Sequence, residues 1–208
     1  MNYYIPQWEE RTSYGFRRID PYAKLFEDRI IFLGTPISDD VANAVMAQLL
    51  CLESMNPDQD VQIYINSPGG SFTALTAIYD TMRFIQPDVQ TVCLGQAASA
   101  AAILLAAGTP GKRLALPNSR ILIHQPYTEG TFGQTSDIEI QAQQSLHIKK
   151  ILLELISEHT GQPIDQVIAD ADRDRWFTAE QAVDYGFIDK VITSTRQVAD
   201  EGRPARTK

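Results

Sequence analysis

Histidine is the first place to look for chemistry, because imidazole is the usual general base near neutral pH and this 208-residue chain has only three. His124 ends an apolar stretch and precedes Gln125, at the kind of strand-to-loop edge where α/β proteins place their sites. His147 stands beside two lysines, which disfavour a protonated imidazole. His159 stands near the predicted end of a helix, where capping is the simpler role. His124 is therefore the best candidate for a general base.

A nucleophile for such a base would follow a strand and open a helix, since the helix dipole and free N–H groups there stabilise negative charge. Ser99, within residues 95–100 (GQAASA), fits this description, and its small neighbours would let a substrate backbone approach. The alternative is a serine that fills space in an alanine-rich buried helix, because the segment lacks the G-x-S-x-G pattern of a nucleophile elbow. Ser67 is a rival, but a turn cap explains it well. On the residues alone, the space-filling role of Ser99 is favoured.

The other parts of such a site would be backbone N–H donors and a carboxylate. Gly69 and Gly70 follow a predicted strand, where adjacent glycines let N–H groups face a ligand, although a plain tight turn explains them equally well. Asp172 and Asp174 lie in one run of alternating charges, and their spacing does not choose between them. Such a run is also typical of a solvated helix end.

Several other kinds of chemistry have no motif in this chain. A Walker lysine motif, a dinucleotide-binding glycine motif after a strand and a histidine–cysteine pattern with metal spacing are all absent from the sequence. We therefore expect no ATP chemistry, no cofactor and no metal site in this chain.

Short β-branched stretches that alternate with helical patterns must position these side chains. Strands are predicted over residues 29–33, 61–67, 89–95, 113–116, 120–124 and 188–192. Helices are predicted over residues 38–54, 71–84, 97–107, 137–160, 164–172 and 179–185. This repeated order of strand and helix predicts a mainly parallel α/β fold.

The longest predicted helix, over residues 137–160, has apolar residues on more than one face. One stripe with helical spacing consists of Ile148, Ile151, Leu152 and Leu155. Ile140 and Leu146 extend the apolar surface to other faces. This pattern indicates burial against a second subunit or a central position in a monomer, and it leaves both open.

Length and composition place the chain among soluble globular proteins of one domain. It is 44% hydrophobic and 21% charged, and its 18 basic and 26 acidic side chains give a formal charge of −8. An acidic surface repels phosphate backbones, so no nucleic-acid partner is expected. The N-terminus lacks the pattern of a cleaved signal, and the longest apolar stretch, residues 97–107, is far short of the ~20 residues that span a bilayer. Cys51 and Cys93 lie in apolar runs and are interpreted as buried, unpaired thiols. We expect a cytoplasmic protein without a membrane partner.

Four motifs, in register over residues 5–192, resemble those of the Clp protease family. They are residues 65–70 (INSPGG), 95–99 (GQAAS), 116–120 (LPNSR) with 124–126 (HQP), and 172–175 (DRDR). Residues 101–113 (AAILLAAGTPGKR) are most similar to actinobacterial members.

For the fold, the resemblance implies a spiral of repeated β-α units of the crotonase type with a protruding handle helix at about 137–160. The peptidase domain would span residues 21–194. An N-terminal axial segment at 1–20 would precede it, and a disordered tail at 195–208 would come after it.

For the site, the resemblance implies a serine endopeptidase. Ser99 would be the nucleophile, His124 its general base and Asp174 the carboxylate that orients the imidazole. The backbone N–H groups of Gly70 and Ala100 would form the oxyanion hole.

The same resemblance implies a substrate and partners. Peptide would lie extended between Ser71 and Phe72 on one side and Pro126 and Tyr127 on the other, held by main-chain hydrogen bonds. Two stacked heptameric rings would enclose the sites, and an AAA+ unfoldase that hydrolyses ATP would deliver unfolded substrates. A paralogous subunit is a further partner to consider.

The surface expected to dock the unfoldase departs from the family. Tyr64 and Phe84 keep the usual aromatic character, but Gln62 and Leu114 occupy positions that are usually aromatic, so we expect weak docking by a ring of this subunit alone. Two alternative functions remain: a catalytically silent ring subunit and a crotonase-like enzyme acting on acyl-coenzyme A. The joint presence of the three triad residue types argues against the silent subunit. The acyl-coenzyme A class normally uses carboxylates near its substrate, and labelling of Ser99 by a serine-directed fluorophosphonate would separate it from a serine peptidase.

Overall fold

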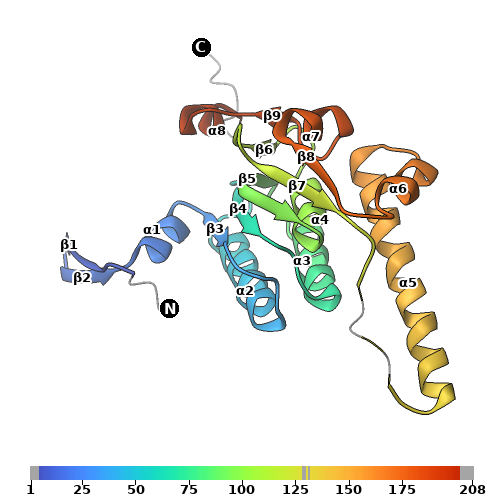
Figure 1. Ribbon diagram of the computed structural model, residues 1–208. Coiled ribbons are helices and arrows are strands. Elements are labelled where there is room, and N and C mark those ends of the chain that lie inside the picture. Colours follow the sequence, from blue (N-terminus) through green and yellow to red (C-terminus); the bar gives the residue numbers. More distant parts are fainter. Residues whose placement is uncertain (1–4, 128–129, 131, 202–208) are drawn as a thin grey trace.

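A mainly parallel sheet organises the computed structural model, which describes residues 5–127, 130 and 132–201 (Figure 1). Its strands are β3 (Ile30–Leu33), β4 (Val61–Ser67), β5 (Val89–Ala98), β6 (Arg113–Ala115), β7 (Arg120–Ile123), β8 (Arg175–Thr178) and β9 (Lys190–Val191). The order is β3-β4-β5-β6-β9, and β7 pairs with the second half of β5. The predicted parallel α/β fold is confirmed. The antiparallel β7–β8 pair was not predicted.

The helices cover the sheet and extend from it. They are α1 (Pro21–Glu27), α2 (Asp39–Met55), α3 (Phe72–Phe84), α4 (Ala100–Ala106), α5 (Thr135–Thr160), α6 (Ile164–Asp170), α7 (Ala179–Tyr185) and α8 (Thr195–Glu201). Helices α2 and α3 lie next to each other along the sheet (Figure 1). Helix α4 is buried along its whole length. Ser38 caps α2 by accepting from the Val41 N–H, as the sequence predicts. The main core lies between strands β3–β5 and helices α2, α3 and α4, and it continues to α5 and α7.

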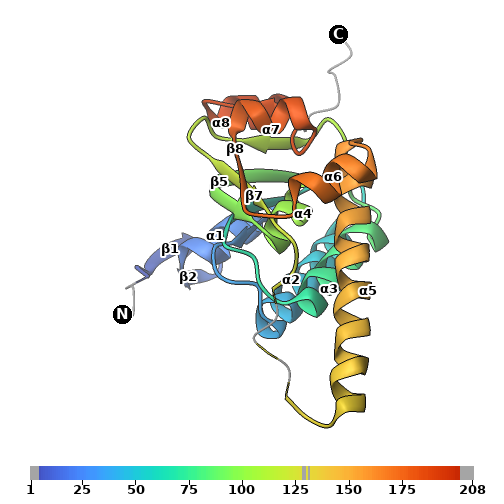
Figure 2. The same cartoon turned by 45° about the vertical axis from the view of Figure 1, so that its right-hand side comes forward.

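Helix α5 is the long helix that the sequence predicts, and half of it projects from the body (Figure 2). Leu153 and Ile156, in its C-terminal half, are buried in the main core. Ile140 and Leu146, nearer its N-terminus, are 64% and 67% exposed. The described part of the chain therefore leaves these apolar residues near its N-terminus largely uncovered.

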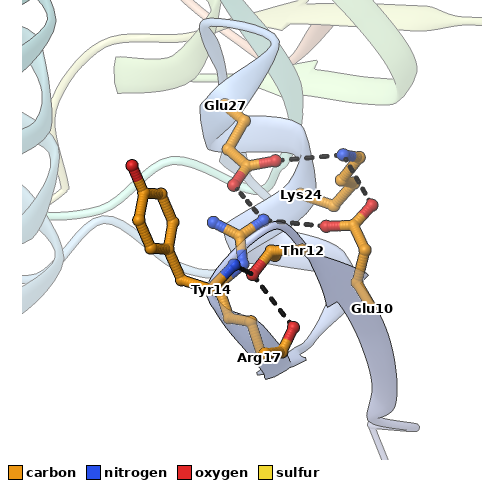
Figure 3. A network of polar contacts seen from close by, with 7 residues as sticks. Glu10, Thr12, Tyr14, Arg17, Lys24 and Glu27 are labelled. Carbon is orange, nitrogen blue, oxygen red and sulfur yellow. Dashed lines mark hydrogen bonds and ion pairs between the residues drawn. The ribbon is translucent and has the colours of Figure 1, made fainter.

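A β-hairpin precedes the main sheet and protrudes from it. Its strands are β1 (Trp8–Thr12) and β2 (Gly15–Ile19), which pair antiparallel. Arg17 contacts Glu10 at 2.9 Å and Glu27 at 2.5 Å, and Lys24 contacts Glu27 at 3.0 Å (Figure 3). Each exposed pair contributes little alone, but together they tie the hairpin to α1. Much of the expected axial segment is thus an ordered hairpin, and residues 1–4 lie outside the described part.

Two expectations from the sequence differ from the structure. Cys51 is exposed on α2, because the apolar run around it belongs to an amphipathic helix whose outer face it occupies; only Cys93 is buried, and burial raises the pKa of its thiol to about 11. The segment expected to be a disordered tail begins with helix α8, whose Val198 is 6% exposed. Residues 202–208 of that segment lie outside the described part.

Candidate active site

Ser99 stands at the junction between β5 and α4 in a strained backbone conformation. Its φ of 55° is rare for a residue with a Cβ, and such strain persists only where the surroundings enforce it. Pairing of β5 with β7 fixes the chain up to Ala98, the Ser99 N–H donates to the Leu122 carbonyl at 2.9 Å, and the buried helix α4 fixes the chain from Ala100 onward. Although Ser99 is the N-cap of α4, its side chain makes no capping bond. Its hydroxyl is therefore available for chemistry.

His124 and Asp174 meet because of the register between β7 and β8. Ile123, the last residue of β7, pairs with Arg175, the first residue of β8. Because the strands are antiparallel, His124, which follows Ile123, faces Asp174, which precedes Arg175. The His124 Nδ1 lies 3.4 Å from the Asp174 Oδ1, which is within reach of an ion pair and slightly longer than an ordinary hydrogen bond. The two side chains are 30% and 66% exposed. The register thus brings an imidazole and a carboxylate together beside β5.

Asp172 does not share this position. Its carboxylate contacts Arg173 at 3.1 Å, and its main-chain carbonyl accepts from the Gln125 side chain at 2.9 Å. The spacing in the sequence could not choose between the two aspartates, but among the described side chains only Asp174 contacts His124 as an ion pair.

A cavity of about 460 Å³ brings together most residues singled out in the sequence. Those that line it are Gly70, Ser71, Phe72, Ser99, Ala100, His124, Pro126 and Tyr127. Asp174 contacts His124 and is not part of the lining. No hydrogen bond joins Ser99 to His124 among the described side chains, although both face this cavity. Catalytic hydrogen bonds often shorten only when substrate is bound.

Sequence reasoning missed the apolar wall of this cavity. Leu75 and Ile103 line it from α3 and α4, and three residues of α5 complete it. These three are Ile148, Leu152 and Ile156. The helical stripe on α5 carried a signal for burial, but no signal showed that it faces Ser99.

The glycine loop before α3 lies against the Ser99 junction. Gly69 has a φ of 89°, and a Cβ there would lie 2.5 Å from the Ala98 carbonyl and 2.8 Å from the Ser99 Cβ. The Ile37 N–H donates to the Gly69 carbonyl and the Ile37 carbonyl accepts from the Ser71 N–H, which leaves the Gly70 N–H outside this pairing. The Ala100 N–H opens α4, where helix N–H groups have no partner in a preceding turn.

The other two histidines lie away from this cavity. His147 is exposed on α5. The His159 Nε2 lies 2.9 Å from the Tyr79 hydroxyl, and burial, aided by the charges of Arg83 and Arg113, lowers the pKa of this imidazole. Within the part of the chain that the structure describes, no group of three or more His, Cys, Asp or Glu residues could hold a metal ion.

The expected docking residues are divided between two places. Tyr64 and Leu114 belong to a small apolar cluster on the sheet face opposite the main core, where Val198 of α8 covers them. Leu114 is fully buried there, which differs from the expectation of an accessible pocket residue. The Gln62 Oε1 is buried and has no hydrogen-bond partner among the described residues. Phe84 is 79% exposed at the end of α3 and is not in this cluster.

Comparison with known proteins identifies the family. The family description "Clp protease" matches residues 13–195. Three curated relatives are ATP-dependent Clp protease proteolytic subunit 1 of Cutibacterium acnes, subunit 2 of Streptomyces coelicolor and subunit 1 of Corynebacterium glutamicum. The first two are each 62% identical over 93% of this chain and cover 90% and 89% of the relative; the third is 60% identical over 91% of both. No helix among the described residues is long and apolar enough to cross a membrane. The chain belongs to the Clp protease family, as a proteolytic subunit.

Proposed function

We propose that this chain is the serine endopeptidase subunit of an ATP-dependent protease, with Ser99, His124 and Asp174 as its catalytic triad. The observation that carries the proposal is the pair of registers around β7. Its pairing with β5 supports placing Ser99 near His124, and its pairing with β8 supports Asp174 rather than Asp172 as the acid.

The proposed mechanism uses these positions directly. His124 takes the proton of the Ser99 hydroxyl while the Oγ attacks the scissile carbonyl carbon. The Nδ1–H donates to Asp174, which stabilises the imidazolium. The N–H groups of Gly70 and Ala100 donate to the oxygen that becomes negative. The C–N bond then breaks, the imidazolium gives its proton to the amine that leaves, and water hydrolyses the acyl-enzyme by the same steps.

The lining of the cavity favours a peptide with an apolar side chain beside the scissile bond. Leu75, Ile103 and Leu152 form an apolar wall next to Ser99, so an apolar side chain would lose contact with water there. Residues 71–72 and 126–127 flank Ser99 and would bind the extended main chain, whose hydrogen bonds tolerate many sequences.

We further propose that the subunit works in two stacked heptameric rings with an AAA+ unfoldase. Ile138, Ile140 and Leu146 of α5, together with Ile164 and Ile168 of α6, are 39–67% exposed, which supports contact with a second copy. The relatives are named ATP-dependent and carry different numbers, which supports an ATPase partner and a paralogous subunit. The cytoplasmic location expected from the sequence stays a prediction.

Replacement of Ser99 by alanine tests the proposed function. We expect turnover of a short fluorogenic peptide to fall by about 10⁴- to 10⁶-fold, because the nucleophile is lost while the packing around it is kept. Ser54→Ala, the same change on the exposed surface of α2, is the control and should keep wild-type turnover. Size and melting temperature should match the wild type for both. Near-native turnover by Ser99→Ala would contradict the assignment and favour another enzyme class.

A further inference from the structure

The segment that carries Asp174 has little packing of its own beyond Ala171, which is buried in the main core. It joins the end of α6 at Asp170 to the start of β8 at Arg175, and Asp172, Arg173 and Asp174 are all exposed. A short exposed segment keeps one conformation only if other groups hold it. The polar contacts of this segment therefore decide where the Asp174 carboxylate lies.

Gln125, the residue after His124, makes three of these contacts. Its backbone N–H donates to the Ala171 carbonyl at 2.7 Å, and its side-chain Nε2 donates to the Asp172 carbonyl at 2.9 Å and to the Asp172 Oδ1 at 3.4 Å. Gln125 therefore holds the segment by hydrogen bonds at Ala171 and Asp172, two of the three residues that precede Asp174.

Lys149 of α5 determines which way the Gln125 amide points. Its Nζ lies 2.8 Å from the Gln125 Oε1. An ammonium group can only donate and a main-chain carbonyl can only accept, so the amide satisfies both only with its oxygen toward Lys149 and its NH₂ toward Asp172. Without Lys149, the Gln125 amide would be free to rotate by half a turn. Its Oε1 would then face the Asp172 carbonyl oxygen, and the hydrogen bond to Asp172 would be lost.

The far end of the segment has a separate anchor. Arg175 forms an ion pair with Asp170, which also accepts from the Tyr185 hydroxyl at 2.9 Å. The Arg175 guanidinium lies 5.0 Å from the Phe177 ring centroid. These contacts fix the start of β8 without any residue of α5. Helix α5 packs on α6, and Lys149 gives it a polar contact with Gln125.

We propose that Gln125 and Lys149 are positioning residues for Asp174, and that through them α5 holds the carboxylate within reach of His124. The inference rests on the proposed function of the triad. It explains why a carboxylate with 66% of its side chain exposed lies only 3.4 Å from the imidazole. A displacement of the carboxylate by ~1 Å can reduce turnover by about 10²-fold.

The test is Lys149→Met, assayed in the assembly in which the wild-type chain turns over peptide. We expect kcat to fall by about 10- to 100-fold with KM close to wild type, because the peptide-binding residues are unchanged. Lys150→Met removes the same charge from the neighbouring, 72% exposed lysine and should keep the wild-type kcat. Lys149→Arg retains a donor without an acceptor and should restore most of the lost kcat.

Gln125→Glu is a second variant, in case Lys149→Met assembles poorly. Its carboxylate keeps a partner for Lys149 but loses the donor to the Asp172 carbonyl, so kcat should again fall with KM retained. Wild-type kcat in either variant, beside an inactive Ser99→Ala, would overturn the positioning role and leave the proposed function standing. A Ser99→Ala variant as active as wild type would overturn both. An equal loss in Lys149→Met and Lys150→Met would also overturn it, since removal of a positive charge from α5 would then be the cause whatever its position.

Discussion

The surroundings of Ser99 and of Asp174 differ in how they hold a side chain in place. Ala98 and Ala100, on either side of Ser99, are both 4% exposed and belong to the packed junction of β5 and α4. Asp174 belongs to an exposed segment held by a strand register and by hydrogen bonds. Changes near Ser99 should therefore act first on stability, and changes near Asp174 should act first on rate.

We expect the largest difference in turnover between asparagine substitutions at Asp174 and at Asp172. Asp174→Asn should lower turnover by about 10⁴-fold, because an amide favours the wrong imidazole tautomer. Asp172→Asn should lower it little, since its main contact with Gln125 uses the backbone carbonyl. Peptide turnover by each variant gives the comparison. The opposite ranking would move the acid by two residues.

Assembly must be measured before these rates are interpreted. Asp174 lies between Arg173 and Arg175, and a change of charge there could alter contacts between subunits. Sizing of each variant in solution separates the two effects, since a variant of native size with low turnover has lost chemistry alone.

The packed side of the comparison is tested by glycine substitutions. Gly69→Ala should destabilise the chain by about 2–5 kcal/mol, because its φ of 89° disfavours a side chain and the new Cβ would meet the Ala98 carbonyl. Gly111 has a similar φ of 85°, but a Cβ there would have no atom within 4 Å. Gly111→Ala should therefore lower the free energy of unfolding by only about 1–2 kcal/mol, from the left-handed backbone conformation alone. Denaturant unfolding measures both. Equal costs would mean that the junction at Ser99 is looser than described.

A smaller effect is expected at His159, whose imidazole has a lowered pKa because it is buried. Below pH ~6.5 the imidazole of His159 is protonated in the unfolded chain. In the folded chain it stays neutral until the pH falls to its lower pKa in that state. Stability should therefore fall as the pH decreases from about 6.5. Melting temperatures of His159→Gln should fall less with acid than those of wild type, with His147→Gln on the exposed part of α5 as the control. Identical slopes for wild type and His159→Gln would contradict the burial argument.

Sequence periodicity predicted the elements that position the site. The strands at 61–67 and 120–124 and the cap at Ser38 need only local pattern, and each lies where the sequence predicts it. Ser99 was also placed correctly at a strand-to-helix junction, but its positive φ has no signal in an alanine-rich segment. The residues alone therefore favoured a space-filling role for Ser99. The strain that argues against this role comes from the tertiary packing of β5, β7 and α4.

Other features depend on contacts between distant residues. β8 is a four-residue strand that directly follows a charged stretch and pairs with β7, so the pairing of His124 with Asp174 could not be predicted from composition. The same holds for α8, whose Val198 packs on residues from three strands. Cys51 was placed in the core because its neighbours are apolar, but a helix turns one of its faces to solvent.

Covalent labelling of the assembled protein with a fluorophosphonate, followed by peptide mapping, tests the triad most directly. The reagent should modify Ser99 in the wild type, because only an activated serine attacks it readily. Labelling should be lost in His124→Ala and retained in His147→Ala. Modification of a different serine, or equally fast modification of Ser99 in His124→Ala, would contradict the proposed catalytic site.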